Sequence, residues 1–270
     1  MAKNYDIVII GAGIAGLTAA IYAARAGKSV LVLESMVYGG QIVQTLDIAN
    51  WPGEISISGP DLMKKIYTQA TQLGVNIEYS EVEKISQADE CLTSKDTKSR
   101  ARRLWLVETE DEKYIAGAII IATGTVPRKL SDKQTRDAGK RPISYCATCD
   151  GAFFKGKPVV VVGSGNTAKY EISYLKNIAS KVYHIHHDDP IPSDAAAVFV
   201  AIGRVPATEF LKGFVKLDSD GYVIAGEDCH TSTPGVYVAG DCRTKSVRQL
   251  VTAAGDGAVA AAEAGKWLAR

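Results

Sequence analysis

Apolar and polar residues follow one another along the chain in an order that predicts the same set of elements twice. Residues 6–34 begin as an apolar strand, pass through a glycine-rich turn and continue as a helix and a second apolar strand. Residues 158–186 repeat this order, and the two segments align without a gap. Such a repeat predicts two nucleotide-binding halves of the doubly wound parallel type. The alignment places Gly11 on Gly163, Gly13 on Gly165, Gly16 on Ala168 and Glu34 on His186.

Between the repeats, the pattern changes from helical to extended. Residues 55–76 predict a loop followed by a helix, and residues 77–121 predict strands interrupted by the polar stretch 86–103. Residues 115–124 predict an apolar strand that ends in glycine. Residues 125–145 contain two prolines and many charges, which is typical of a linker.

After the second repeat, the apolar segments predict a return to the first domain. Residues 196–203 and 221–240 predict strands, and residues 246–268 predict an alanine-rich helix. We therefore expect an α/β protein with two Rossmann-like domains, in which a smaller nucleotide-type domain is inserted into a discontinuous larger one. The expected boundaries are 1–125 with 204–270 for the larger domain and 126–203 for the inserted domain.

Composition and charge exclude several classes of protein. The 270 residues carry 31 basic and 30 acidic side chains, so a net charge of +1 gives no electrostatic argument for nucleic acid or membrane binding. No apolar run approaches the roughly 18 residues of a membrane-spanning helix, and the N-terminus lacks a signal-peptide pattern. We therefore expect a cytoplasmic protein. Its length is enough for a core that needs neither disulfides nor a structural metal.

The first glycine-rich turn has the spacing of a dinucleotide site. Gly11, Gly13 and Gly16 follow a strand and open a helix, as G-x-G-x-x-G requires. Glycines allow a tight turn and a close approach to a pyrophosphate, whose charge the helix amides bind. Glu34, at the end of the second strand, stands where a carboxylate accepts hydrogen bonds from an adenosine ribose. The alternative is a turn whose glycines serve helix packing alone.

Four further motifs give the chain a resemblance to a known family. They are WPG at 51–53, ATG at 122–124, TSTPGVYVAGDC at 231–242 and RQLVTAAGDG at 248–257. Together they resemble the flavoprotein disulfide reductases, most closely the low-molecular-weight thioredoxin reductases, over nearly the whole chain. The resemblance implies that the cofactor is FAD.

The resemblance also implies a set of FAD-binding residues. Asp241 corresponds to the family's ligand for the ribityl and phosphate groups, and residues 248–250 begin a helix whose amides face the flavin pyrimidine ring. Such amides favour negative charge at N1 and O2 of reduced flavin. Each position also has a structural alternative, such as helix capping by Asp241. The expected FAD-binding residues are Gly11, Gly13, Ile14, Ala15, Gly16, Glu34, Gly40, Gln41, Asn50, Val82, Ala122, Thr123, Gly124, Asp241, Arg248, Gln249 and Leu250.

Residues 146–150, which read CATCD, carry the candidate redox chemistry. A C-x-x-C pair near a helix start lowers a thiol pKa, and two neighbouring thiols carry two electrons as a disulfide. By resemblance, Cys149 faces the flavin, Cys146 attacks the disulfide of a partner protein, and Asp150 acts as the acid or base. We expect no bound metal. The main alternative is a zinc site completed by Cys229 and Cys242.

The second repeat departs from the family where NADPH binds. Thioredoxin reductases of the common kind carry His-Arg-Arg and a further Arg at this strand end, and the Arg side chains hold the 2′-phosphate. This chain has His186, His187, Asp188 and Asp189. Two carboxylates repel a phosphate dianion that a bidentate Arg would hold. The ribose acceptor equivalent to Glu34 is also missing.

The second repeat is also too short for a complete nucleotide domain. A further crossover after its second strand needs at least about 10 residues. About nine residues separate His186 from the predicted strand at 196. We therefore expect a truncated sheet, whose glycine turn remains for packing, and no working NADPH site.

These departures make the chain similar to the ferredoxin-dependent flavin thioredoxin reductases, a branch with a CATC motif and a shortened nucleotide domain. The resemblance implies thioredoxin as the substrate, ferredoxin as the electron donor and a homodimer. Because ferredoxins are generally acidic, the basic segments 98–103 and 128–141 are candidates for the docking surface. The alternatives are an NADPH-dependent thioredoxin reductase, a diflavin disulfide oxidoreductase and a non-enzymatic flavin redox sensor.

Overall fold

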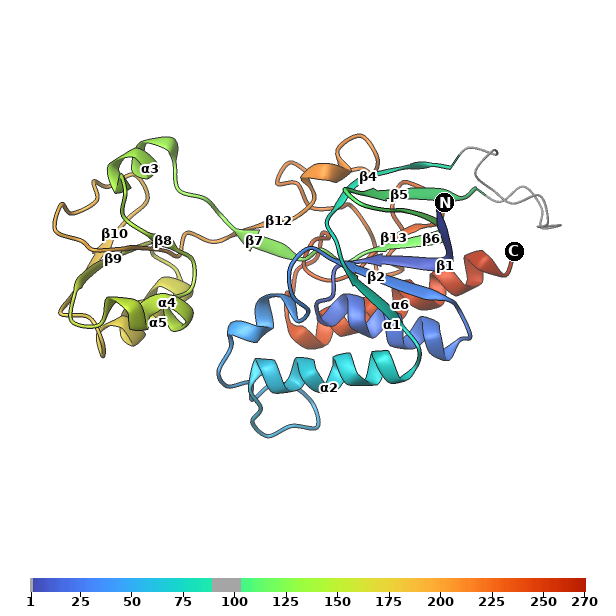
Figure 1. Ribbon diagram of the computed structural model, residues 1–270, viewed down its shortest axis with the longest axis horizontal. Helices are drawn as coiled ribbons and strands as arrows, with labels where there is room; N and C mark the ends of the chain where they lie inside the picture. The colour runs from blue at the N-terminus through green and yellow to red at the C-terminus, as the bar shows by residue number, and fades with distance from the viewer. Residues whose placement is uncertain (1, 89–102) are drawn as a thin grey trace. The chain divides into compact units, whose positions relative to one another are not determined.

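The chain forms two compact units in this computed structural model, which describes residues 2–88 and 103–270. Unit 1 consists of Met1–Thr125 and Pro206–Arg270, and unit 2 of Val126–Val205 (Figure 1). The chain passes between the units twice, along β7 (Thr125–Pro127) and β12 (Arg204–Pro206), and these two short strands pair with each other. Of the predicted basic segment 98–103, all but Arg103 lies outside the described residues.

Unit 1 is built on one seven-stranded sheet, in which β3, β2, β1 and β6 are neighbours and run parallel. The first half of β6 pairs with β5 in the antiparallel direction, and β5 pairs with β4. The second half of β6 pairs with β13 in the parallel direction. The strands are β1 (Lys3–Ile10), β2 (Val30–Glu34), β3 (Asn76–Tyr79), β4 (Val82–Gln87), β5 (Trp105–Thr109), β6 (Lys113–Ile121) and β13 (Val236–Val238).

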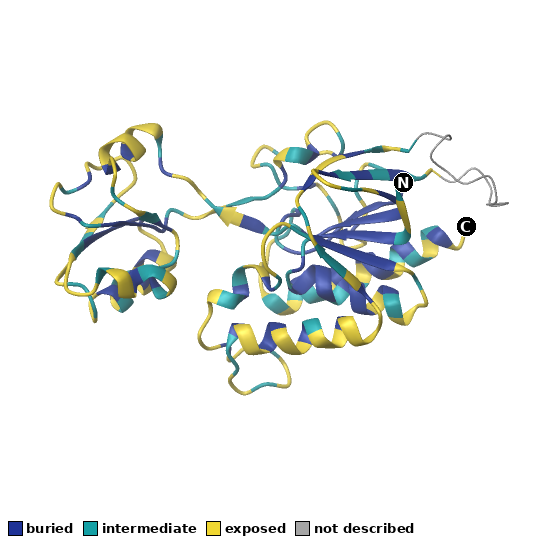
Figure 2. Ribbon diagram, in the orientation of Figure 1, coloured by how far each residue is buried: buried dark blue, intermediate teal, exposed yellow. Residues whose placement is uncertain are grey.

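Both faces of this sheet are covered, which explains why its central strands are continuous apolar runs. Ile7 and Ile9 of β1 pack in one core cluster with α1 (Ile14–Arg25), α2 (Gly59–Gln72) and α6 (Leu250–Leu268). Val8 and Ile10 pack in a second cluster with residues of β4, β5 and the segment 211–242. Figure 2 shows these strands buried between the helices and the opposite layer. Two short helices, η1 (Gly40–Gln44) and η4 (Glu209–Leu211), complete the unit.

Unit 2 has the same layered design on a smaller scale. Its four strands run parallel in the order β10, β9, β11, β8. One face of this sheet packs against Leu130, which precedes α3, and against Ala138 of α3. The other face packs against residues of α4 and α5. The elements are α3 (Asp132–Ala138), β8 (Ile143–Ser144), α4 (Ala147–Asp150), η3 (Gly151–Phe154), β9 (Pro158–Val162), α5 (Asn166–Leu175), β10 (Lys181–Ile185) and β11 (Val198–Val200).

The predicted fold class is confirmed, but the expectation of a linker over 125–145 is wrong. This segment contains β7, α3 and β8, and β8 belongs to the sheet of unit 2. Helix α3 begins where the Ser131 side chain accepts a hydrogen bond from the Gln134 amide, and it ends at Gly139. Residues 221–240, predicted as strands, form β13 and otherwise only isolated bridges.

In the described part of the chain, no helix combines the length and the apolar character that crossing a membrane requires.

Candidate active site

Four parallel strands of unit 1 end at the same level, which places the loops that follow them side by side. Ile10 of β1 pairs with Leu33 of β2 and with Ile121 of β6, and Val238 of β13 also pairs with Ile121. In open parallel sheets, ligands bind outside the carboxyl ends of the strands, where the order of strands reverses. This edge of the sheet carries Gly11, Gly13, Glu34, Ala122, Thr123, Gly124 and Asp241 from the predicted set.

Glycine is required for different reasons at the three positions of the first turn. Gly11 has a φ of 107°, and a Cβ built on it would lie 2.4 Å from the carbonyl oxygen of Ala122. A Cβ on Gly16 would lie 1.9 Å from the carbonyl oxygen of Gly11. A Cβ on Gly13 would meet no atom of the described residues within 4 Å. Packing therefore explains Gly11 and Gly16, whereas Gly13 faces the open space that a pyrophosphate would need.

Helix α1 presents its first turn to that space. Ile14 and Ala15 begin the helix behind Gly13, and among the described residues no side chain caps this end and no acidic residue occupies the first turn. Glu34 closes the turn from the next strand, where its Oε2 accepts a hydrogen bond from the Ala12 amide at 2.8 Å. An anion is favoured at such a helix end, and a carboxylate beside it can accept hydrogen bonds from ribose hydroxyls. These features fit an adenine dinucleotide.

Other predicted residues lie around the same edge. Gln41 Nε2 donates a hydrogen bond to Thr125 Oγ1 at 2.8 Å, directly after Gly124. A Cβ on Gly40 would lie 3.4 Å from the Cα of Gly13, so the 40–41 segment lies against the first glycine turn. Val82 differs from these, because it starts β4 and its side chain belongs to the apolar core.

The last predicted group lies at the start of α6. Asn50 Nδ2 donates to Gln249 Oε1 at 3.2 Å, and Gln249 caps the helix that begins at Leu250. Arg248 lies over the ring of Tyr222 at 4.2 Å, and its Nε donates to the carbonyl oxygen of Asp241 at 3.4 Å. Residues far apart in the sequence are thus brought together at one helix end and one strand end.

A buried ionic cluster lies behind this edge and was not predicted from the sequence. Asp256 of α6 accepts hydrogen bonds from the Gly240 amide, from Arg243 Nε and Nη2 at 2.9 Å each, and from Lys245 Nζ at 2.8 Å. Burial raises the pKa of Asp256, but Arg243, Lys245 and the Gly240 amide outweigh this and lower it. The cluster fixes the loop that carries Asp241. A lone carboxylate in the alanine-rich run AAGDGAVAAA was the available signal.

The redox motif lies in unit 2, where Cys146 and Cys149 are joined by a disulfide. Cys146 caps α4, and the Cys149 amide donates to Cys146 Sγ at 3.2 Å. Ser144 Oγ accepts from the Cys146 amide at 3.1 Å and donates to Asp150 Oδ2 at 2.6 Å. The serine therefore connects the predicted acid or base to the first cysteine. Sequence reasoning missed Ser144, whose position two residues before the motif was its signal.

The other two described cysteines are buried in unit 1. Burial raises the pKa of Cys229 to about 11 and also raises the pKa of Cys242. The zinc alternative needs four thiolates, but Cys146 and Cys149 are bonded to each other. Residues 2–88 and 103–270 contain no group of three or more His, Cys, Asp or Glu side chains arranged to hold a metal ion.

The second glycine turn keeps its shape while its strand end differs. Gly163 has a φ of 140°, and a Cβ on it would lie 2.1 Å from the carbonyl oxygen of Ala201. His184 Nε2 lies 2.6 Å from the Gly163 carbonyl oxygen, and Asp189 Oδ2 accepts a hydrogen bond from the His186 amide at 2.8 Å. Residues 186–197 then reach β11 without a helix or strand, so the sheet is truncated.

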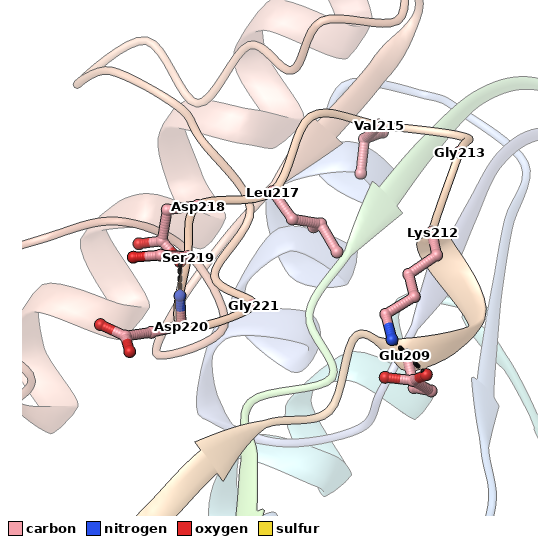
Figure 3. Close-up of a pocket in the computed structure, with 9 residues that line it drawn as sticks. All are labelled: Glu209, Lys212, Gly213, Val215, Leu217, Asp218, Ser219, Asp220 and Gly221. Carbon is pink, nitrogen blue, oxygen red and sulfur yellow. Dashed lines mark hydrogen bonds and ion pairs between the residues drawn. The ribbon is translucent and has the colours of Figure 1, made fainter.

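A separate open pocket of unit 1 is lined by residues of the segment 209–221 (Figure 3). Lys212 forms an ion pair with Glu209, and Asp218 Oδ1 accepts a hydrogen bond from the Asp220 amide. The predicted site residues do not line this pocket. Its polar groups thus serve their own loop, and the strand-end edge remains the candidate site.

Comparisons with known proteins identify the family of this chain. The family model for pyridine nucleotide-disulphide oxidoreductases matches residues 5–193 and 188–257. A thioredoxin reductase of Listeria innocua is 35% identical over 314 residues, covering 98% of this chain and 94% of its own. That alignment is longer than the 270 residues of this chain, so the relative contains segments that this chain lacks.

Solved structures show the same family over the whole chain. The thioredoxin reductase of Lactococcus lactis has 32% identity and a TM-score of 0.83, and the match covers 98% of this chain and 99% of that one. A ferredoxin-flavin thioredoxin reductase of Clostridium acetobutylicum has 26% identity and a TM-score of 0.61, with 99% and 98% covered. The predicted cofactor, FAD, is confirmed by this relationship. The chain therefore belongs to the pyridine nucleotide-disulphide oxidoreductases, as a flavoprotein disulfide reductase of the thioredoxin reductase type.

Proposed function

We propose that this chain reduces the disulfide of thioredoxin and takes its electrons from reduced ferredoxin rather than from NADPH. The observation that carries the proposal is the end of β10, where His186, His187, Asp188 and Asp189 stand in place of a phosphate-binding arginine cluster. All four residues are exposed, and the Asp189 carboxylate already accepts the His186 amide. A phosphate dianion at this strand end would meet carboxylates and no bidentate donor.

The short connection after β10 supports the same conclusion. In unit 1, β2 carries Glu34, whose side chain contacts the glycine turn. The next strand, β3, pairs with the outer edge of β2. In the sheet that the structure describes for unit 2, β10 is an edge strand, and residues 186–197 lead directly to β11. The crossover that would cover the adenosine half of a nucleotide is therefore missing.

The FAD is proposed to lie along the strand-end edge of unit 1. When bound, it supplies the redox group that exchanges electrons with both a one-electron donor and a disulfide. The Gly13 turn and α1 would hold its pyrophosphate, Glu34 its adenosine ribose, and Asp241 its ribityl and phosphate groups. Gln249 and Leu250 would present the first amides of α6, which favour negative charge. The remaining proposed contacts are Gly11, Ile14, Ala15, Gly16, Gly40, Gln41, Asn50, Val82, Ala122, Thr123, Gly124 and Arg248.

The dithiol of unit 2 is proposed to pass the electrons on. Cys149 receives them from the flavin side, and Cys146 attacks the disulfide of thioredoxin. Asp150 gives or takes the thiol proton, and its bond to Ser144 holds it beside Cys146. A ferredoxin near −400 mV and a thioredoxin near −270 mV differ by about 130 mV, or about 6 kcal/mol for two electrons. The reaction is downhill without NADPH.

Part of the basic segment 128–141 is available for docking an acidic ferredoxin. Lys129, Lys133, Arg136 and Lys140 are exposed on and around α3. Arg141 is excluded from this surface, because its guanidinium donates to backbone carbonyl oxygens that include those of Ala195 and Ser193. The homodimer and the cytoplasmic location stay predictions.

An NADPH-dependent thioredoxin reductase is the second candidate. It is favoured by the second glycine turn, because Gly165 starts α5 with the same open geometry as Gly13.

The two candidates separate in an anaerobic assay of the FAD-loaded protein with oxidised thioredoxin. Reduced ferredoxin is offered in one arm and NADPH in the other, and thioredoxin thiols are counted over time. We expect turnover with ferredoxin alone, and its loss in both Cys146→Ser and Cys149→Ser. Glu209→Gln, changed at an exposed site of unit 1 outside the proposed docking surface, serves as the matched control. Rapid turnover with NADPH would overturn the donor assignment, and turnover in either serine variant would overturn the dithiol roles.

A further inference from the structure

A buried carboxyl group lies beside the redox motif at a position where the helix pattern calls for an apolar residue. Glu171 of α5 is only 6% exposed. It stands three residues after Ala168 and four before Leu175, so the three share one face of the helix. Ala168 and Leu175 pack in one apolar cluster with Ala147 of α4. Glu171 thus directs a carboxyl group between α5 and the helix that carries the two cysteines.

The hydrogen bonds of this carboxyl group are incomplete. The Ala147 amide donates to it, whereas Oε2 is buried and has no hydrogen-bond partner among the described residues. Burial raises the pKa of Glu171 from 4.5 to about 7, against the smaller lowering effect of the Ala147 amide. Because the desolvated charge has no counter-ion, the group changes its proton occupancy near neutral pH.

The titratable groups on the elements beside Glu171 are those of the redox motif and of α5 itself. On α4 and its cap they are Cys146, Cys149 and Asp150, and on α5 itself the neighbours are Lys169, Tyr170 and Tyr174. No charged side chain among the described residues contributes to the pKa shift of Glu171. With the motif oxidised, the cysteines are uncharged, and reduction is therefore the event that brings a new charge to this turn.

The carboxyl group and the first sulfur use neighbouring amides of one turn. The Cys149 amide donates to Cys146 Sγ at 3.2 Å, and the Ala147 amide donates to Glu171. Cys146 directly precedes Ala147, so a thiolate on Cys146 would form in the same turn as the amide that the carboxyl group uses. Two like charges in a desolvated place raise each other's pKa, so one of the two groups must hold a proton.

We propose that Glu171 is a positioning residue of the redox motif, which holds the first turn of α4 through the Ala147 amide and takes up a proton when the disulfide is reduced. Two electrons from the reduced flavin break the Cys146–Cys149 bond. One sulfur takes a proton and becomes a thiol, the other remains a thiolate, and Glu171 takes the second proton. Oxidation of the dithiol by a partner disulfide returns both protons. This inference rests on the proposed role of the cysteine pair.

The test is the pH dependence of the equilibrium between the motif disulfide and dithiothreitol, measured in the FAD-loaded protein by trapping thiols and identifying the motif peptide. Because oxidation of dithiothreitol releases two protons, the equilibrium constant changes about tenfold per pH unit for each proton by which the uptake of the motif differs from two. Above about pH 7, we expect two protons per disulfide in the natural protein and only one in Glu171→Gln once a thiolate forms. Below this pH the two profiles coincide, because Glu171 is already protonated.

Asp137→Asn is the matched control, since it removes an exposed carboxyl group of the same unit and should leave the profile unchanged. Glu171→Asp, which keeps the carboxyl group, should restore part of the second proton. Identical profiles for Glu171→Gln and the natural protein would overturn the inference, as would a disulfide that does not exchange with dithiothreitol.

A second measurement needs no variant and decides the matter even where Glu171→Gln does not fold. Infrared difference spectra of the natural protein above neutral pH should show a protonated carboxyl band that appears on reduction, and its absence would contradict the proposal. Neither readout depends on the electron donor. Turnover with NADPH would therefore overturn the proposed function and leave this inference standing.

Discussion

The two glycine-rich turns of this chain have nearly the same backbone in different surroundings. Gly11 and Gly163 both have positive φ, and in each case the missing Cβ would strike a carbonyl oxygen of a neighbouring strand end. The helices behind them begin at Gly13 and Gly165 with φ of −76° and −79° and with ψ of −174° in both. A shared turn therefore shows that a strand, a helix and a neighbouring strand pack closely. It does not by itself show that a nucleotide binds.

What differs is the strand end beside each turn. Glu34 accepts a hydrogen bond from the Ala12 amide, and its strand, β2, pairs with β3. At the equivalent place in unit 2, the Asp189 carboxylate accepts the His186 amide, and His184 lies at the Gly163 carbonyl oxygen. Under the proposed function, the strand end and the next strand decide whether a dinucleotide binds, and the glycines are only one condition.

The two units also treat a buried carboxyl group in opposite ways. Asp256 of unit 1 is paired with Arg243 and Lys245, which lower its pKa despite burial. Glu171 of unit 2 has no such partner among the described residues, and burial raises its pKa to about 7. The first arrangement keeps a permanent charge beneath the candidate FAD site, whereas the second provides a group that can change its charge.

The largest effect is expected for Asp256→Asn, which leaves Arg243 and Lys245 buried without their counter-ion. Removing one partner of a buried ionic pair costs about 3 to 5 kcal/mol. Urea unfolding followed by tryptophan fluorescence measures this, because Trp51, Trp105 and Trp267 all lie in unit 1. Glu209→Gln, which breaks an exposed ion pair with Lys212, is the control and should cost about 1 kcal/mol or less.

The same variant predicts a pH effect with a defined sign. The pKa of Asp256 is lowered in the folded protein, so its stabilising contribution is present above the unfolded value of 3.8 and is lost as pH falls through the folded pKa. The natural protein should therefore lose stability on acidification below about pH 4, partly through this group. An equal acid dependence in Asp256→Asn would contradict this assignment.

Gly11→Ala and Gly163→Ala test whether the two turns share their packing role. Both added Cβ atoms meet a carbonyl oxygen, at 2.4 and 2.1 Å, in a backbone conformation that alanine rarely adopts. Each change should lower the free energy of unfolding of its own unit by about 2 to 4 kcal/mol. Hydrogen exchange of peptides from 6–34 and 158–186 reports the units separately. Loss of FAD in Gly11→Ala alone would support the difference in binding between the two turns. Loss of FAD in both variants would contradict it.

Glu171→Gln should remove a pH-dependent penalty from unit 2. The pKa of Glu171 is raised from 4.5 to about 7 on folding, so the natural unit becomes less stable as pH rises through this range and constant above it. The difference amounts to about 3 kcal/mol at most. Hydrogen exchange of α5 at pH values within and above this range measures it. A slope that survives in the glutamine variant would show that another group causes it.

Gly13→Ala and Gly165→Ala should give the smallest effect and the cleanest one. Neither added Cβ meets an atom of the described residues within 4 Å, so the fold should tolerate both. A methyl group at Gly13 would occupy space needed by the pyrophosphate, and we expect FAD affinity to fall about tenfold, or about 1.4 kcal/mol. Titration of the apoprotein with FAD measures this. Gly165→Ala should leave FAD affinity and turnover unchanged, and an effect on NADPH use would revive the second candidate function.

The sequence predicted those parts of the fold and site that depend on local pattern. Apolar runs with glycines at fixed spacing identified β1, α1 and β2 and their counterparts β9, α5 and β10. The parallel order of these strands brings the loops that follow them to one edge of the sheet. Residues such as Gly11, Glu34 and Asp241 were placed correctly at strand ends, although their ligand contacts stay predictions.

The missed features depend on residues that are distant in the sequence. The helix sequence alone does not show whether a lone carboxylate has a cationic partner. For Asp256 the partner is Arg243, which lies in another loop, whereas Glu171 has no such partner among the described residues. Helix α3 was missed because it buries only Gln134 and Ala138, which is too little apolar surface for a helical period to be visible. Tertiary context decides these cases.

The divided pairing of β6 has a consequence for how the protein is made. Unit 2 is one continuous segment, whereas unit 1 needs residues from both sides of it, including β13 and α6. During synthesis, unit 2 can fold as soon as it leaves the ribosome. At that time the second half of β6 has no strand paired with the edge that β13 later occupies. An open apolar edge invites pairing with other chains. The newly made protein should therefore be most prone to aggregation, and most dependent on chaperones, in the interval before β13 arrives.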